Sequence, residues 1–159
     1  MPPKTPTVPT ADEPRERARW YLAKAVQRLQ DAEETLARER YDSAAGLAVL
    51  AAINGGDASC VARAGVRAAG KSHADAVRLI RQLLPGDELA QRASNQLANV
   101  VGLKNEIEYE ARRTTAKDAT ELVGWARRIV RWAAETVEEA ERTRPGRTNR
   151  AGGAGNPRH

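Results

Sequence analysis

Two groups of polar side chains in this sequence have the residue types that acid–base or phosphate chemistry requires. The first is the pair Arg67 and His73, with five residues between them. Arginine can hold a phosphate through its planar guanidinium, and histidine exchanges protons near neutral pH. Only one other histidine exists, and it is the last residue of the chain, His159. The pair is therefore interpreted either as an ordered turn or as the centre of a metal-independent ribonuclease.

The second group lies along one expected helix and consists of Lys104, Asn105, Glu108, Tyr109 and Arg112. Asn105 and Tyr109 are four residues apart and share a helix face, and Glu108 can pair with Arg112 along the same side. These polar residues follow an apolar stripe. Two interpretations stay open, a solvated helix face with a half-buried tyrosine or a polar cleft at a helix or subunit boundary.

The sequence offers little support for a disulfide, a metal site or a glycine-rich phosphate-binding loop. The single cysteine, Cys60, can form neither an internal disulfide nor a cysteine-based metal site by itself. The sequence has no glycine-rich phosphate loop and no HExxH motif. We therefore predict neither a metal nor a cofactor. The three tryptophans, Trp20, Trp125 and Trp132, are interpreted as core or interface anchors rather than as platforms for stacked bases.

The basic character of the chain belongs to its ends. The formal charge is +5 and the isoelectric point is near 9.8. Four arginines without an acid lie in 144–159, and Lys4 is the one charge in 1–11, so the segment 12–143 is electrically neutral. The high isoelectric point alone is thus a poor argument for a nucleic-acid-binding surface. The prolines and glycines of both ends predict disordered tails over 1–11 and 144–159, around one domain at 12–143.

Apolar residues recur at helical spacing through this domain and predict an all-α, up-and-down bundle of about five helices. The expected ranges are 12–36, 42–68, 72–83, 87–113 and 117–144. Asp12, Asp42 and Asp87 are the expected N-caps, and Gly70 is the expected C-cap of the second helix.

The second helix contains Gly55 and Gly56, which predict a bend or the close approach of a neighbouring backbone. Asp57, which follows them, could face the same groove as the second polar group.

Several stretches together resemble the HEPN superfamily. They are ERYDSAAGLAVLAAINGGDAS at 39–59, then Gly70 with His73 shortly after, then LKNEIEYEARRTTAKDATELVGWARRIV at 103–130. The chain is most similar to small bacterial HEPN proteins related to the partners of minimal nucleotidyltransferases. In active members an arginine, four to six residues and a histidine form the catalytic motif, and two protomers bring their motifs together and cleave RNA without metal.

The resemblance implies that this motif is degenerate here. Lys104 stands where the family has arginine and Tyr109 where it has histidine, while Asn105 matches the polar residue that often follows the arginine. Lysine lacks the planar fork that grips phosphate bidentately, and the phenol of tyrosine titrates near pH 10. A tyrosine two residues beyond the histidine in some members is Ala111 here.

We therefore expect a cytoplasmic homodimer that binds RNA, a nucleotide or a protein partner without catalysis, within a toxin–antitoxin or defence-type system. A nucleotidyltransferase-type protein is an expected partner, and no membrane is involved, because no apolar stretch is judged long enough to span one. Two alternatives stay open. One is a metal-independent ribonuclease toxin that uses Arg67 and His73, and the other is a purely structural dimerisation module.

Overall fold

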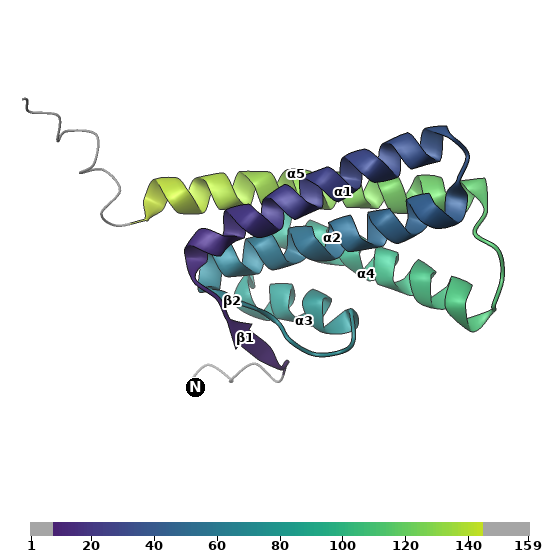
Figure 1. Ribbon diagram of the computed structural model, residues 1–159. Coiled ribbons are helices and arrows are strands. Elements are labelled where there is room, and N and C mark those ends of the chain that lie inside the picture. The colour runs from purple at the N-terminus through teal and green to yellow at the C-terminus, as the bar shows by residue number, and fades with distance from the viewer. Residues whose placement is uncertain (1–7, 145–159) are drawn as a thin grey trace, which may run out of the picture.

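The computed structural model describes residues 8–144 and confirms the all-α class, with one small two-stranded sheet added (Figure 1). The elements, in chain order, are β1 (Thr10–Asp12), a 3-10 turn η1 (Arg15–Arg17), α1 (Ala18–Ala37), α2 (Tyr41–Ala64), β2 (Val66–Ala68), α3 (Ala74–Leu83), α4 (Glu88–Tyr109) and α5 (Ala116–Thr143). The expectations for residues 1–7 and 145–159 concern a part of the chain outside the described residues.

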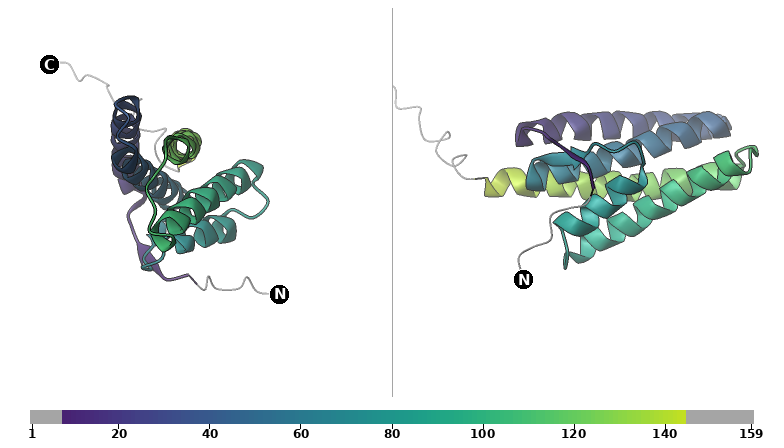
Figure 2. Two further views of the ribbon diagram at one scale, coloured as in Figure 1. Left: turned by 90° about the vertical axis from the view of Figure 1, so that its right-hand side faces the viewer. Right: turned by 90° about the horizontal axis from the view of Figure 1, so that it is seen from below.

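Helix α2 is the central element, because it contacts each of the other four helices. Helix α1 packs against α2 and α5, while α3 and α4 lie on the other side of the molecule (Figure 2). The buried side chains of α2 are mostly alanines, of which Ala44, Ala48, Ala51, Ala52 and Ala58 are fully buried. Such small side chains let neighbouring helices approach closely, and larger residues from α3, α4 and α5 complete the core.

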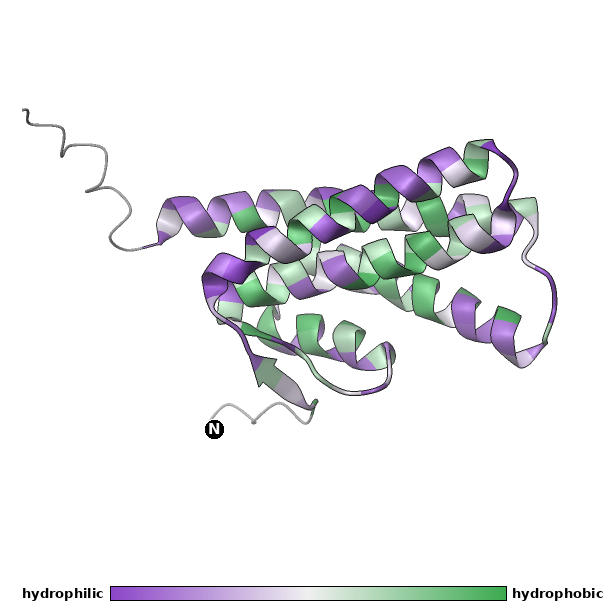
Figure 3. Ribbon diagram, viewed as in Figure 1, coloured by the Kyte–Doolittle hydropathy of each residue, from purple (hydrophilic) through white to green (hydrophobic). Residues whose placement is uncertain are grey.

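Helix α2, Tyr41–Ala64, is long and apolar enough to cross a membrane by its length and composition alone. The expectation that no apolar stretch has this length was therefore wrong. The most apolar part of α2 is 72% buried inside the protein, as in the core helix of a globular bundle. Figure 3 shows hydrophobic residues along α2 and hydrophilic ones at the C-terminal end of α4.

Of the two glycines in the middle of α2, Gly55 lies at a close approach, which is one of the two possibilities that the sequence predicted. A Cβ added to Gly55 would lie 3.1 Å from Cγ2 of Ile129 in α5, and 3.7 Å from the backbone carbonyl carbon of that residue. At Gly56 the nearest atoms belong to Ile80 and Leu97, at 3.5 Å. Gly55 therefore sets how closely α2 and α5 pack.

The first helix begins at Ala18, not near Asp12. Residues Thr10–Asp12 instead pair antiparallel with Val66–Ala68, and Pro14 holds extended backbone before η1. Val8 is buried in the core at 5% exposure. Residues 8–11 thus belong to the folded part and not to the expected N-terminal tail, because strand pairing and burial of Val8 order them.

The second helix also ends earlier than predicted, at Ala64. Its C-cap is Gly65, whose φ of +67° is readily adopted only by glycine, and not Gly70. The chain needs this reversal because residues 66–68 return as the strand that pairs with β1.

Of the two remaining predicted N-caps, Asp87 is confirmed and Asp42 is wrong. Asp87 caps α4 by accepting a hydrogen bond from the Ala90 N–H at 3.0 Å, as predicted. Helix α5 begins slightly early, at Ala116, because Thr115 and Asp118 form a reciprocal capping box. The predicted cap Asp42 lies instead in the first turn of α2, after Arg40.

Candidate functional site

Lys104 lies in the second half of α4, and its side chain is 28% exposed. Its ammonium is 3.0 Å from a carboxylate oxygen of Glu108, one helical turn further along. A pair of this kind on a helix surface stabilises by about 0.3–0.5 kcal/mol, and lysine before glutamate is the weaker order. A phosphate can therefore replace Glu108 as the partner of the Lys104 ammonium at a small cost in free energy.

A polar hollow of about 210 Å³ opens beside Lys104. It is lined by Asn105 and Val101 from α4 and by the loop before α3, which contributes Lys71, Ser72 and His73. The hollow has two ammonium groups and no carboxylate among its lining residues, so its electrostatic potential favours an anion.

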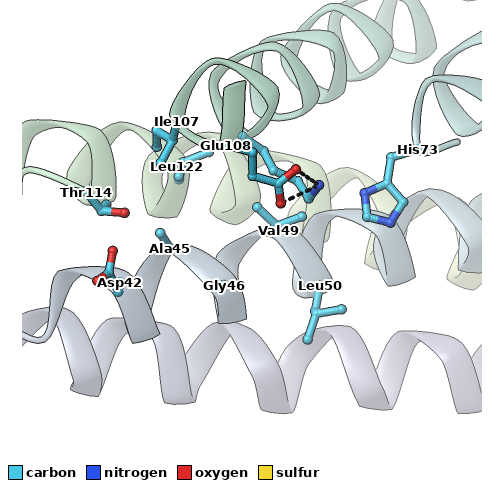
Figure 4. Close-up of a pocket in the computed structure, with 11 residues that line it drawn as sticks. Asp42, Ala45, Gly46, Val49, Leu50, His73, Ile107, Glu108, Thr114 and Leu122 are labelled. Carbon is cyan, nitrogen blue, oxygen red and sulfur yellow. Dashed lines mark hydrogen bonds and ion pairs between the residues drawn. The ribbon is translucent and has the colours of Figure 1, made fainter. Parts of the chain in front are cut away.

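A second, mainly apolar pocket of about 240 Å³ adjoins the first, because His73 and Lys104 line both. Its apolar walls come from three helices, through Val49 and Leu50 of α2, Ile107 of α4 and Leu122 of α5. In Figure 4 His73 stands at one end of this pocket, and Thr114 and Asp42 stand at the other. The two spaces form one groove with a cationic part and an apolar part, which we call the His73–Lys104 groove.

The surroundings of His73 favour its neutral imidazole form. Partial burial lowers its pKa from the ordinary value, and the nearby positive charge of Lys104 lowers it further, whereas Glu108 opposes both effects. A neutral imidazole can accept a proton or donate a hydrogen bond from its N–H, and it adds no repulsion between cations in the groove.

The remaining members of the second polar group lie outside this groove. Tyr109 is the last residue of α4 and is 92% exposed. Arg112 pairs with Asp118 at 2.6 Å and with Glu110 at 3.0 Å, so its guanidinium joins the end of α4 to the start of α5. This contact strongly lowers the pKa of Asp118. Arg112 therefore has a structural role in the α4–α5 turn.

The Arg67–His73 pair is not brought together by the fold. The Nε of Arg67 donates to Glu13 at 3.1 Å. The pairing of β1 with β2 sets Arg67 opposite Ala11, two residues before Glu13, and so brings the two side chains within reach. Tyr21 also donates to Glu13, at 2.9 Å. His73 instead faces Lys104, so the two members of the predicted pair belong to different sites.

Asp57 lies near Arg67 and not in the His73–Lys104 groove. Burial raises the pKa of its carboxyl to about 7, against the opposing effect of the positive charges of Arg67 and Lys24. Asp57 and Glu13 thus form a second titratable cluster, around Arg67.

Sequence reasoning missed Lys71, Ser72 and Leu50. Lys71 and Ser72 directly precede His73, so a polar loop was visible in the sequence, but its contact with α4 depends on how α3 packs. Leu50 is one of several apolar residues in the second helix, and nothing in the sequence marks it as the one that is 44% exposed at the pocket.

Within residues 8–144, no three His, Cys, Asp or Glu side chains gather closely enough to hold a metal ion. A comparison with family models matches the one described as HEPN domain to residues 18–138, which covers α1 to α5. A comparison with curated proteins gives no match. The matched range contains every residue of the His73–Lys104 groove.

Proposed function

This chain belongs to the HEPN domain family, and on that premise we propose that it is a non-catalytic binding module for RNA or a nucleotide. The observation that carries the proposal is the His73–Lys104 groove, in which a cationic hollow adjoins an apolar pocket. A nucleotide complements both parts, because it carries an anionic phosphate and a planar base whose faces pack against apolar side chains.

Each part of the groove has an assigned partner. The ammonium groups of Lys71 and Lys104 bind a phosphate, and Ser72 and Asn105 offer it further hydrogen-bond donors. The base lies against Val49 and the other apolar walls of the adjoining pocket. Each space alone is smaller than a typical ligand pocket of roughly 300 Å³ and upward, so one ligand occupies both.

The absence of catalysis rests on the residue types at the family motif. Lys104 replaces the arginine, and Tyr109, which replaces the histidine, is a phenol that points into solvent at the end of α4. Phenols are in general poorer proton shuttles at neutral pH than imidazoles.

The test is binding of a short labelled single-stranded RNA and of a nucleoside triphosphate to the full chain at low salt, where phosphate contacts are strongest. We expect Lys104→Gln to weaken binding by at least about tenfold, because a hydrogen bond to a charged group contributes roughly 1.5–3 kcal/mol. Glu108→Gln should tighten binding, since it frees Lys104.

The matched control is Lys117→Gln, which removes an exposed lysine of α5 that lines neither part of the groove. Equal losses in Lys104→Gln and Lys117→Gln, or no binding by the wild type at low salt, would rule out the groove as the binding site.

A second candidate function is metal-independent cleavage of RNA, with Lys104 rather than Arg67 as the partner of His73. The observation that favours it is that His73 and Lys104 line the same two spaces. Burial and the ammonium lower the pKa of the imidazole, which favours the unprotonated form that a general base needs. His73 would take the proton of a ribose 2′-hydroxyl as that oxygen attacks the adjacent phosphorus, water would protonate the departing 5′-oxygen, and a cyclic phosphate would remain.

This candidate predicts RNA cleavage in EDTA that disappears in His73→Ala and persists in Arg67→Gln. Lack of cleavage by the wild type, with cleavage appearing in the double variant Lys104→Arg, Tyr109→His, would favour the non-catalytic module. A stable dimer that binds no ligand, and that Tyr109→Ala dissociates, would instead favour a purely structural module.

The cellular setting in this proposal is a toxin–antitoxin or defence-type system, in the cytoplasm, with a nucleotidyltransferase-type protein partner. Its support is the likeness of residues 103–130 to HEPN proteins of that kind. A minimal nucleotidyltransferase gene next to the gene for this chain is the observation that would test it.

A further inference from the structure

A second cleft, remote from the His73–Lys104 groove, lies between the first half of α4 and the second half of α5. Its volume is about 270 Å³. It shares no lining residue with either part of the groove. Three of its lining side chains are arginines, Arg92 from α4 and Arg128 and Arg131 from α5.

These three guanidinium groups are exposed, and none of them has an ion pair or a side-chain hydrogen bond within the part of the chain that the structure describes. The neighbouring Arg127 shows the contrast, because its Nε is 3.0 Å from a carboxylate oxygen of Glu33. Like charges gathered in one concavity repel one another, so an anion bound among them is stabilised by all three.

The floor of the cleft is apolar and strengthens this attraction. Trp132 is 8% exposed, Ala93 is 4% exposed, and Leu89 stands at the edge with 55% exposure. An apolar wall lowers the local dielectric constant, and a charge pair beside it interacts more strongly than in open water. Glu135 is the one carboxylate among the lining residues, which leaves the cleft with two net positive charges.

The residue type indicates which anion the cleft accepts. The guanidinium is planar and presents paired N–H donors that match two oxygens of one phosphate. Arg128 and Arg131 are three residues apart on α5 and so project from one face, opposite Arg92 on the antiparallel α4. Donors therefore approach the same space from two helices, an arrangement suited to a phosphate group with oxygens on several sides.

We propose that this α4–α5 cleft is a binding site for a phosphorylated ligand, separate from the His73–Lys104 groove. Arg92 lies twelve residues before Lys104 on the same helix, which is about 18 Å at the rise of an α-helix. The phosphate comes either from a free phosphorylated molecule or from the backbone of a nucleic-acid strand. The site does not depend on the function proposed for the groove.

The experiment measures binding of inorganic tripolyphosphate, a nucleoside triphosphate and a short single-stranded RNA to the full chain by calorimetry at low salt. The test variant is Arg128→Gln, Arg131→Gln. The control is Arg38→Gln, Arg40→Gln, which removes the same charge from two exposed arginines between α1 and α2. The basic C-terminal segment is identical in all of these proteins, so its contribution cancels.

The groove also binds phosphate in the function proposed above, so tripolyphosphate is titrated in the Lys104→Gln background, which weakens that second site. In this background we expect Arg128→Gln, Arg131→Gln to bind tripolyphosphate at least about tenfold more weakly, and Arg38→Gln, Arg40→Gln to stay within about twofold. Binding that remains in Lys104→Gln and is lost with the two arginines belongs to the cleft. Equal weakening in both double variants, or no binding of tripolyphosphate to the wild type, would overturn the proposal.

The other two ligands identify the source of the phosphate. A loss confined to the nucleoside triphosphate assigns the cleft to a free phosphorylated molecule. A loss of RNA affinity assigns the cleft to a nucleic-acid strand, provided that the affinity also depends less steeply on salt, by an amount that corresponds to about two phosphate contacts. Thermal unfolding of both double variants, followed by circular dichroism, confirms that each comparison is made on folded protein.

Discussion

Among single residues, the decisive pair consists of His73 and Lys104, which lie 31 positions apart in the sequence. His73 and Lys104 line the same two spaces, and the charge of Lys104 acts on the imidazole. Glu108 acts in the opposite direction. The protonation of His73 therefore reports directly on the charges in the groove.

This yields a prediction for His73. We expect Lys104→Gln to raise its pKa, because a positive neighbour is removed, and Glu108→Gln to lower it, because a negative neighbour is removed. The measurement is an NMR titration of the two histidine resonances, assigned with His73→Ala, and the resonance of His159 serves as the internal reference. Shifts of the same sign in both variants, or no shift in either, would contradict the geometry of the groove.

A second prediction concerns Asp57, whose pKa is raised to about 7 by burial. Between roughly pH 4 and pH 7 the carboxyl of Asp57 is protonated in the folded protein and ionised in the unfolded chain. The folded state thus binds more protons, so the stability contributed by this group falls as the pH rises through that interval.

We therefore expect Asp57→Asn to gain stability relative to wild type on going from pH 4 to pH 8. The gain should be on the order of 2–4 kcal/mol. Urea unfolding at several pH values measures it, with Asp31→Asn, an exposed carboxylate of α1, as the control. A difference between Asp57→Asn and wild type that does not change with pH would show that this carboxyl titrates normally.

At the scale of elements, the packing of α2 against α5 depends on one missing side chain. The Cβ of an alanine at Gly55 would lie 3.1 Å from Ile129, whereas one at Gly56 would make ordinary contacts at 3.5 Å. Alanine in a helix interior is otherwise favoured over glycine by up to about 1 kcal/mol. The two neighbouring glycines should therefore respond differently to the same substitution.

We expect Gly56→Ala to raise the free energy of unfolding by about 0.5–1 kcal/mol. Gly55→Ala should give no such increase or should destabilise the protein, because Ile129 in α5 must shift by a few tenths of an ångström. Gly102→Ala in α4, with nothing within 4 Å of the added Cβ, gives the effect of helix propensity alone. Chemical denaturation measures all three. If Gly55→Ala were as stabilising as Gly102→Ala, the close approach would be refuted.

At the scale of the whole molecule, large apolar side chains remain exposed on a protein whose core is otherwise well filled. Trp20 is 57% exposed, Leu89 is 55% exposed and Tyr109 is 92% exposed. Exposed aromatic residues are enriched at protein interfaces. Tyr109 follows the His73–Lys104 groove along α4, so a homodimer joined there would bring two grooves near its two-fold axis.

This homodimer is the fourth prediction. We expect sedimentation equilibrium to give twice the chain mass of 17.3 kDa, and Tyr109→Ala to weaken the association by about 1–2 kcal/mol or more, as truncation of a buried interface aromatic does. Trp20→Ala, on the distant helix α1, is the control. A monomer at all concentrations, or equal weakening by both substitutions, would remove Tyr109 from the interface.

Features that depend on neighbouring residues along the chain could be predicted from the sequence. Helical spacing of apolar residues gives five helices, Asp87 caps α4 by a contact within one turn, and Gly55 marks a close helix approach. The resemblance carried by residues 39–59 and 103–130 gave the family. These features are local because helix periodicity and capping depend on residues only a few positions apart.

The tertiary structure alone decided which polar side chains meet. Pairing of β1 with β2 directs Arg67 to Glu13 and separates it from His73, and the packing of α3 on α4 brings His73 to Lys104. The antiparallel packing of α4 and α5 likewise places Arg92 beside Arg128. Sequence spacing cannot give such contacts, because they depend on how helices distant along the chain pack and on which faces they present to one another.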